Sequence, residues 1–206
     1  MGYFIDGILR EAKTRSSSMG ALNIDTVYLG GGTPSMLPPD LIDKLFDRLG
    51  NIFRFCFDTE INLEANPATF GKSAAQTYAR SGVTRVSLGA QSFNPDVLKT
   101  LGRTHGPREI ARSVDLLRAA AIEDISIDLM FSIPGQTLEQ WRESLESALA
   151  LSPNHISAYN LTYEEDTPFF TRFREGLYTD LEELNASMFE VAHEHLTTRG
   201  LRHYET

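Results

Sequence analysis

The sequence contains very little cysteine: Cys56 is the only one among 206 residues. One cysteine cannot form an internal disulfide, and it cannot supply the several thiolates that hold a structural zinc ion or an iron–sulfur cluster. A reducing, cytoplasmic setting is therefore expected, and no metal ligand is assigned. Because Phe55 and Phe57 flank Cys56, we expect an inert, buried thiol.

Long apolar runs and an excess of basic residues are also missing. No stretch approaches the roughly 20 consecutive apolar residues that cross a membrane, and the N-terminus lacks the features of a secretion signal. Lys and Arg number 19 against 28 Asp and Glu, which gives a net charge of −9. Such a chain repels a phosphate backbone. We therefore expect neither a membrane span nor a nucleic-acid partner.

The residues that are present favour one α/β domain. Apolar residues make up 41% of the chain, enough for one substantial core. Short β-branched runs alternate with longer amphipathic stretches, and this rhythm is typical of βα units around a parallel sheet. The expected strands cover residues 26–29, 60–64, 85–88, 125–129 and 155–159.

Helices are expected between these strands, over residues 39–49, 72–81, 107–121, 137–149 and 181–198. Thr137 and Gln140 have the spacing of a capping box at the start of one of them. An opening helix over residues 3–13 has no strand before it. The strand at 26–29 is therefore expected to lack a neighbour on one side, so that either another segment covers this edge or the chain is a truncated piece.

A glycine-rich loop, Gly30–Gly32, follows the first expected strand and precedes Thr33. Ligands of α/β folds gather at the carboxyl ends of the strands, and glycines let backbone groups approach a ligand closely. A tight strand-to-helix turn is the alternative interpretation. The loop is not a phosphate-binding P-loop, because no Gly-Lys-Ser/Thr follows it.

Polar side chains also mark the ends of the next three strands: Glu64, Gln91 and Asp128. Each alone is explained by a structural hydrogen bond, since burying an unpaired carboxylate costs several kcal/mol. Together with the glycine loop they predict one ligand site. Arg103 is a candidate clamp for a ligand carboxylate, with a surface ion pair as the alternative.

These pieces, in this order, resemble the anaerobic coproporphyrinogen-III-oxidase-like family of radical S-adenosylmethionine (SAM) proteins. Within that family the resemblance is closest to the heme chaperone branch, HemW, and it covers nearly the whole chain. The matching stretches are residues 28–35, 63–67, 85–93, 101–105, 126–130 and 134–137.

The resemblance implies a partial (β/α)6 TIM-like barrel without its first strand, as an incomplete radical SAM core over residues 1–206. It also implies a SAM pocket. By this resemblance the methionine amino group is held by Gly31, Gly32 and Thr33. The methionine and ribose are lined by Glu64, Gln91 and Arg103, and the pocket wall continues with Asp128 and Thr162.

The chain departs from the family in two respects. It lacks the CxxxCxxC motif that holds a 4Fe–4S cluster, and Ser132 stands where the family has glycine. We therefore expect a fragment inactive in radical chemistry, whose full-length parent carries the cluster. The alternative is a cluster-free, non-catalytic protein that binds SAM, heme or a partner. A third interpretation is a conventional enzyme that uses Glu64 and Asp128 for acid/base chemistry.

The stretches 63–67 and 134–137 favour the heme chaperone branch over the oxidases proper. The expected small-molecule ligands are SAM and heme or a porphyrin, and the expected macromolecular partner is a heme-accepting protein. No residue is assigned a catalytic role.

Overall fold

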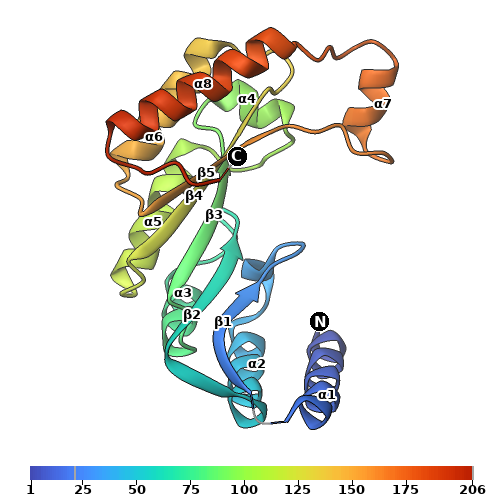
Figure 1. Ribbon diagram of the computed structural model, residues 1–206, viewed down its shortest axis with the longest axis vertical. Helices are drawn as coiled ribbons and strands as arrows, with labels where there is room; N and C mark the ends of the chain where they lie inside the picture. Colours follow the sequence, from blue (N-terminus) through green and yellow to red (C-terminus); the bar gives the residue numbers. More distant parts are fainter. Residues whose placement is uncertain (21, 206) are drawn as a thin grey trace. The chain divides into compact units, whose positions relative to one another are not determined.

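The computed structural model describes residues 1–20 and 22–205 and shows an α/β fold (Figure 1). Five strands form one sheet in the order β1-β2-β3-β4-β5, in which β1 pairs with β2, and β2 with β3, in parallel. The strands are β1 (Asn23–Leu29), β2 (Arg54–Ala65), β3 (Arg85–Gln91), β4 (Asp124–Phe131) and β5 (His155–Asn160). All five predicted strands are confirmed.

The described residues form eight α-helices, six of which were predicted. They are α1 (Gly2–Met19), α2 (Pro39–Ile52), α3 (Lys72–Arg80), α4 (Pro95–Thr100), α5 (Pro107–Ala119), α6 (Leu138–Ala150), α7 (Pro168–Arg174) and α8 (Glu182–Thr198), with a short 3-10 helix, η1 (Pro34–Met36). Within the described part of the chain, no helix is both long and apolar enough to cross a membrane. At one edge of the sheet, β1 pairs with β2 alone among the described strands.

The chain divides into two compact units. The first comprises Met1–Gly89 and Ala111–Ser126, and the second comprises Ala90–Ile110 and Ile127–Thr206. Strands β3 and β4 each begin in the first unit and end in the second. The carboxyl ends of β1 and β2 therefore belong to the first unit, and those of β3, β4 and β5 belong to the second.

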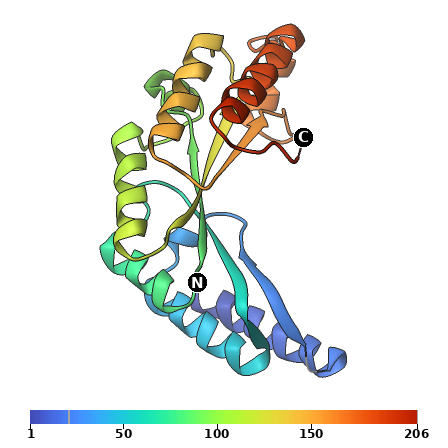
Figure 2. The same ribbon diagram turned by 60° about the vertical axis from the view of Figure 1, so that its left-hand side comes forward.

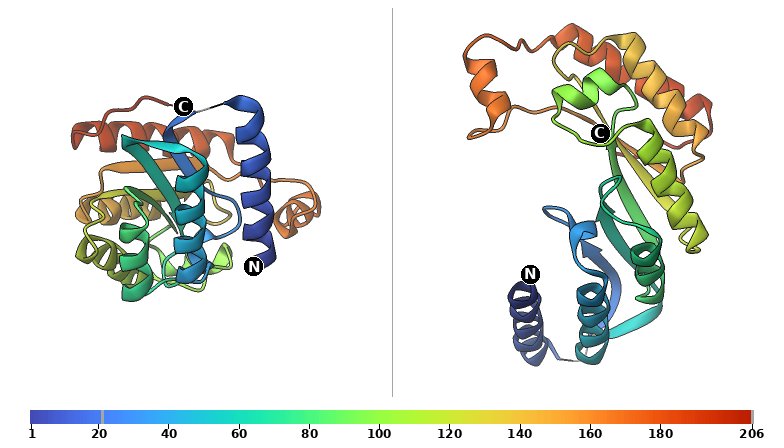
Figure 3. Two further views of the ribbon diagram at one scale, coloured as in Figure 1. Left: turned by 90° about the horizontal axis from the view of Figure 1, so that it is seen from below. Right: turned by 180° about the vertical axis from the view of Figure 1, so that it is seen from behind.

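Helices α1 and α2 lie side by side in the first unit (Figure 3). An ion pair joins them, with the Lys44 Nζ 2.7 Å from Asp6 Oδ1. Lys44 lowers the pKa of the Asp6 carboxyl through this hydrogen bond and its positive charge. Of the α1 side chains only Ile5 is buried, so most of α1 stays in contact with solvent.

The start of β2 corrects the prediction for Cys56. The register of β1 with β2 jumps between Ile24 and Thr26, because the segment 56–59 stands opposite a single residue of β1 and bulges out of the pairing. Thr59 Oγ1 closes the bulge by donating to the Ile24 carbonyl at 2.7 Å. Phe57 is consequently fully exposed, and Cys56 is half-buried, with its thiol donating to Asp25 Oδ1 at 3.2 Å.

Helices α6 and α8 pack against each other in the second unit (Figure 2). The only tryptophan of the chain, Trp141 on α6, is completely buried, and its indole Nε1 donates to the carbonyl of Met188 on α8 at 2.8 Å. The capping box predicted from Thr137 and Gln140 is confirmed, since each side chain accepts a hydrogen bond from the backbone N–H of the other. These two side chains determine where α6 begins.

Candidate functional site

The three glycines that follow β1 are required for two different reasons. A Cβ added to Gly30 would lie 2.3 Å from Cε1 of Tyr28 and 3.2 Å from Cδ of Glu64, so this position needs glycine for close packing. Gly31 and Gly32 have open space around them but adopt φ values of +80° and +62°. These left-handed conformations favour glycine. The loop therefore needs glycine at Gly30 for close packing, and at Gly31 and Gly32 for its left-handed backbone.

The Glu64 carboxylate, near the end of β2, holds this loop in place. Its Oε2 accepts a hydrogen bond of 2.9 Å from the backbone N–H of Gly31, and its Oε1 accepts one from the Tyr28 hydroxyl. Each carboxylate oxygen can accept more than one hydrogen bond. Glu64 is thus a fixed, half-buried carboxylate with capacity left for a ligand donor.

A second set of contacts joins the glycine loop to the segment after β2. Asn66 Nδ2 donates to Thr33 Oγ1 at 3.2 Å, and the Asn66 N–H donates to Ser35 Oγ at 3.1 Å. The hydroxyl of Tyr78 donates to the Ser35 carbonyl at 3.2 Å, and burial raises the pKa of Tyr78 to about 12. The structure therefore brings the loop residues of the predicted site and its first carboxylate together.

Gln91, the last residue of β3, has two unusual features. Its φ is +66°, a left-handed conformation that is uncommon for a residue with a side chain, and it is only 5% exposed. Its Oε1 accepts a hydrogen bond of 2.5 Å from the hydroxyl of Tyr159 on β5. Residues held in sparsely populated conformations concentrate at functional sites. Tyr159 was not among the predicted site residues.

The backbone on both sides of Gln91 is anchored. Before it, the Ala90 carbonyl lies 3.1 Å from Nε2 of His105, which is buried. After it, Ser92 Oγ lies 3.2 Å from Oγ of Ser144 on α6. The pKa of His105 is lowered, chiefly because burial disfavours its charged form. A neutral imidazole with its proton on Nε2 suits the contact with the carbonyl.

The other predicted residues of the second unit occupy different positions. Arg103 is half-buried close to His105, whose pKa its positive charge lowers further, and Asp128 is half-buried on β4. Thr162 follows β5, is exposed, and donates from Oγ1 to Oε1 of Glu164 at 3.1 Å. The structure therefore places Gly31, Gly32, Thr33 and Glu64 in the first unit, and Gln91, Arg103, Asp128 and Thr162 in the second.

Ser132, directly after β4, has a φ of +63°. Its Oγ is buried and has no hydrogen-bond partner among residues 1–20 and 22–205. The backbone here has the shape that glycine adopts most easily, and glycine is the residue that the family resemblance led us to expect at this position.

No metal site is found in the part of the chain that the structure describes. That part contains no group of three or more His, Cys, Asp or Glu residues arranged to hold a metal ion. The Cys56 thiol is hydrogen-bonded to Asp25, and the carboxylate raises the pKa of the thiol through this bond. A 4Fe–4S cluster needs several thiolates, so the residues present do not fit one.

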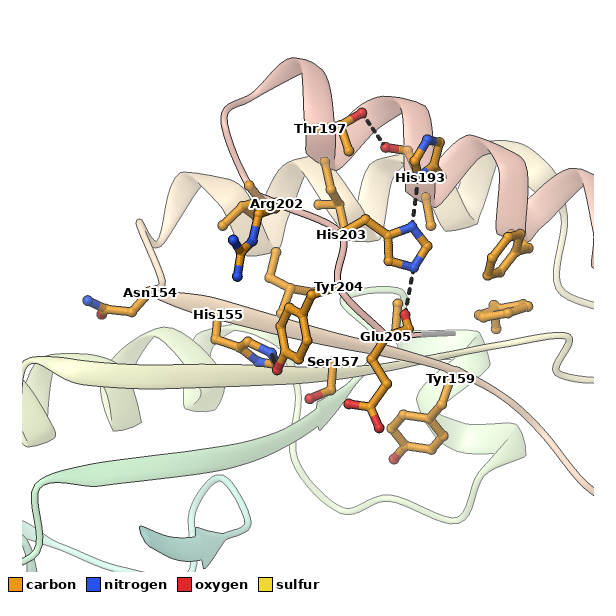
Figure 4. A pocket seen from close by; sticks show the side chains of 17 residues that line it. Asn154, His155, Ser157, Tyr159, His193, Thr197, Arg202, His203, Tyr204 and Glu205 are labelled. Carbon is orange, nitrogen blue, oxygen red and sulfur yellow. Dashed lines mark hydrogen bonds between the residues drawn. The ribbon is translucent and has the colours of Figure 1, made fainter. Parts of the chain in front are cut away.

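A cavity of about 530 Å³ lies within the second unit, between β5, α8 and residues 201–205 (Figure 4). His203 projects into it, with Nδ1 2.7 Å from Nδ1 of His193 and Nε2 2.6 Å from the Glu205 carbonyl. His155 Nε2 lies 2.7 Å from the hydroxyl of Tyr204. Both ring nitrogens of His203 are therefore engaged, and this ring offers no lone pair to a metal.

Comparison with known proteins gives a consistent result. The profile of the radical SAM superfamily matches residues 6–148. The heme chaperone HemW of Lactococcus lactis is 35% identical over 99% of this chain and 54% of its own length. HemW of Escherichia coli is 38% identical over 89% of this chain and 48% of its own length. The chain thus spans about half the length of the curated relatives it matches.

Among solved structures, the coproporphyrinogen III oxidase HemN of Escherichia coli, a radical SAM enzyme, superposes with a TM-score of 0.87. The alignment covers 98% of this chain and 46% of HemN at 23% sequence identity. This likeness confirms the predicted fold class, a partial TIM-like barrel of the radical SAM type.

Proposed function

Because this chain belongs to the radical SAM superfamily, as the core of a HemW- and HemN-like protein, we propose that it binds S-adenosylmethionine. The observation that carries the proposal is the contact of Glu64 with Gly31. It fixes a carboxylate beside a loop whose backbone is shaped by glycine, at the carboxyl end of neighbouring parallel strands. This is where ligands of α/β folds bind.

The residue types suit the parts of SAM. A positively charged amino group is stabilised by a fixed carboxylate such as Glu64, and the ligand carboxylate by an arginine fork such as that of Arg103. Ribose hydroxyls donate to and accept from groups such as the Gln91 amide. In the proposed assignment Gly31, Gly32 and Thr33 hold the methionine amino group, Glu64, Gln91 and Arg103 line the methionine and ribose, and Asp128 and Thr162 continue the wall.

No radical step is assigned to this chain, because its one cysteine does not fit the thiolate set of a 4Fe–4S cluster. What the residues of the proposed site do is bind and orient a ligand. The second candidate function is a cluster-free, non-catalytic role in binding SAM, heme or a partner.

The proposed cellular role is heme handling in the cytoplasm. The relatives that support it are named heme chaperones, and the identity of 35% and 38% to them favours heme transfer over the decarboxylation catalysed by an oxidase. Heme or a porphyrin would then be the second small-molecule ligand, and a heme-accepting protein the partner. We propose no residue of this chain as the heme ligand.

Isothermal titration calorimetry with SAM tests the proposal. The purified chain should take up SAM, and Glu64→Gln should weaken binding by roughly 10-fold or more, since hydrogen bonds to charged groups contribute about 1.5–3 kcal/mol. Glu60→Gln, on the exposed earlier part of β2, is the matched control and should bind like the wild type. Absence of SAM uptake would overturn the proposal.

A parallel titration with hemin, followed by the Soret band, separates the two ligand classes. Hemin uptake that persists in Glu64→Gln would support a distinct heme site. Hemin uptake without SAM uptake would favour the cluster-free heme-binding alternative.

A further inference from the structure

We propose that Tyr159 is a positioning residue that orients the Gln91 side chain for ligand binding. The inference rests on the proposed function and deepens it, because it adds a residue to the SAM site. The two side chains come from different strands, β3 and β5, and meet through a hydrogen bond of 2.5 Å between the Tyr159 hydroxyl and Gln91 Oε1.

The backbone of Gln91 is held in place by its neighbours. His105 engages the carbonyl of Ala90 at 3.1 Å, and the Ser92 N–H donates to the same carbonyl at 2.8 Å. The hydroxyl of Ser144 accepts from the N–H of Phe93 at 3.2 Å. These contacts hold the Gln91 backbone in a left-handed conformation that glutamine rarely adopts. They thereby fix the position of the Gln91 Cα and the direction in which its side chain leaves the backbone.

These backbone contacts do not determine the orientation of the Gln91 side-chain amide. A primary amide can present either its oxygen or its nitrogen to a ligand, because the two ends have nearly the same shape. The Tyr159 hydroxyl can donate to the oxygen, and this fixes the Gln91 oxygen toward β5. The two N–H donors of the amide then face away from the tyrosine, where they suit a ligand acceptor such as a ribose oxygen or a carboxylate.

Tyr159 is itself placed by the sheet. Immediately beyond β5, the N–H of Leu161 donates to the Phe131 carbonyl at the end of β4, at 3.0 Å. Tyr159 remains 39% exposed, so its ring is not a central part of the core. Removing only its hydroxyl should therefore affect Gln91 much more than it affects folding.

A double-mutant cycle on the full chain tests the inference, with SAM as the titrant. Tyr159→Phe should raise the Kd for SAM roughly 2–12-fold, the effect of one hydrogen bond that contributes about 0.5–1.5 kcal/mol. Gln91→Ala should raise the Kd further. In the Gln91→Ala background, Tyr159→Phe should have no additional effect, because the group it orients is gone.

Two controls separate positioning from general damage. Tyr163→Phe removes a hydroxyl but keeps the ring, whose centroid lies 4.5 Å from that of Phe173 in a stacked pair. This substitution should leave the Kd for SAM unchanged. The melting temperature followed by Trp141 fluorescence should be similar in Tyr159→Phe and the wild type, since this tryptophan lies in the same unit.

The outcomes are distinguishable. Equal Kd values for Tyr159→Phe and the wild type, or independent and additive losses in the cycle, would overturn the role of Tyr159 while leaving SAM binding intact. No SAM uptake by the wild type would overturn the proposed function and this inference together. A loss in Tyr159→Phe that vanishes in the Gln91→Ala background supports the inference.

Discussion

The backbone N–H of Gly31 donates to the carboxylate of Glu64, 33 residues further along the chain, at 2.9 Å. Because the Tyr28 hydroxyl bonds to the same carboxylate, Glu64 joins the loop after β1 to the end of β2. The contact therefore has a structural consequence besides the proposed role of Glu64 in binding, and substitutions can measure it.

Glu64→Ala should lower the free energy of unfolding by about 1–3 kcal/mol, because it leaves a backbone donor and a hydroxyl without their acceptor. Tyr28→Phe removes only one of these bonds and should cost less, about 0.5–1.5 kcal/mol. Urea denaturation followed by circular dichroism measures both. A larger loss in Tyr28→Phe than in Glu64→Ala would contradict this account of the loop.

Gly30→Ala should destabilise the chain by about 1–3 kcal/mol through overpacking. The new Cβ would meet the Tyr28 ring, and that ring cannot swing away without breaking its bond to Glu64. Gly50→Ala is the matched control, because Gly50 lies exposed within α2 with nothing within 4 Å of the added Cβ. This control should stabilise the chain by about 0.5–1 kcal/mol.

His105 should make folding stability depend on pH. Burial lowers its folded-state pKa below the ordinary value, so the unfolded chain binds the proton more readily than the folded chain. The stability contribution is present above the unfolded pKa of about 6.5 and decreases as the pH falls from there toward the lowered folded pKa. His105→Asn should show a smaller decrease in urea midpoint between about pH 7.5 and pH 5. Identical pH profiles would refute this assignment.

Cys56 should react slowly with thiol reagents despite its partial exposure. The hydrogen bond to the Asp25 carboxylate raises the pKa of the thiol, so less thiolate is present near neutral pH. Asp25→Asn should lower that pKa and speed alkylation by iodoacetamide. Asp58→Asn removes a more weakly acting charge and should have a smaller effect. The pH dependence of the alkylation rate measures both, and no acceleration in Asp25→Asn would show that Asp25 does not control the thiol.

The local features that the sequence predicted well are those encoded within a few residues. The alternation of apolar runs indicated the five strands, and the spacing of Thr137 and Gln140 indicated the start of α6. Helices α4 and α7 were not predicted because they are too short for an apolar repeat. Their starts rest on single capping side chains, Asn94 and Thr167.

The features that the sequence could not predict depend on contacts between distant residues. Tyr159 lies 68 residues from Gln91, and no local pattern pairs the two. Cys56 looked buried because of its phenylalanine neighbours, but the bulge closed by Thr59 turns this segment outward. Alternation of apolar residues predicts which face of a strand is buried only where the register with its neighbour is continuous.

The left-handed backbone at Gln91 is strained, yet its side chain makes a buried hydrogen bond. Gln91 and Ala121 have nearly the same φ, +66° and +65°. Glycine at either position should relieve this backbone strain. At the exposed Ala121 this relief should raise thermal stability, whereas at Gln91 the same change would also delete a buried amide and its hydrogen bond to Tyr159. Substitutions made for heat resistance should therefore target Ala121 and keep Gln91.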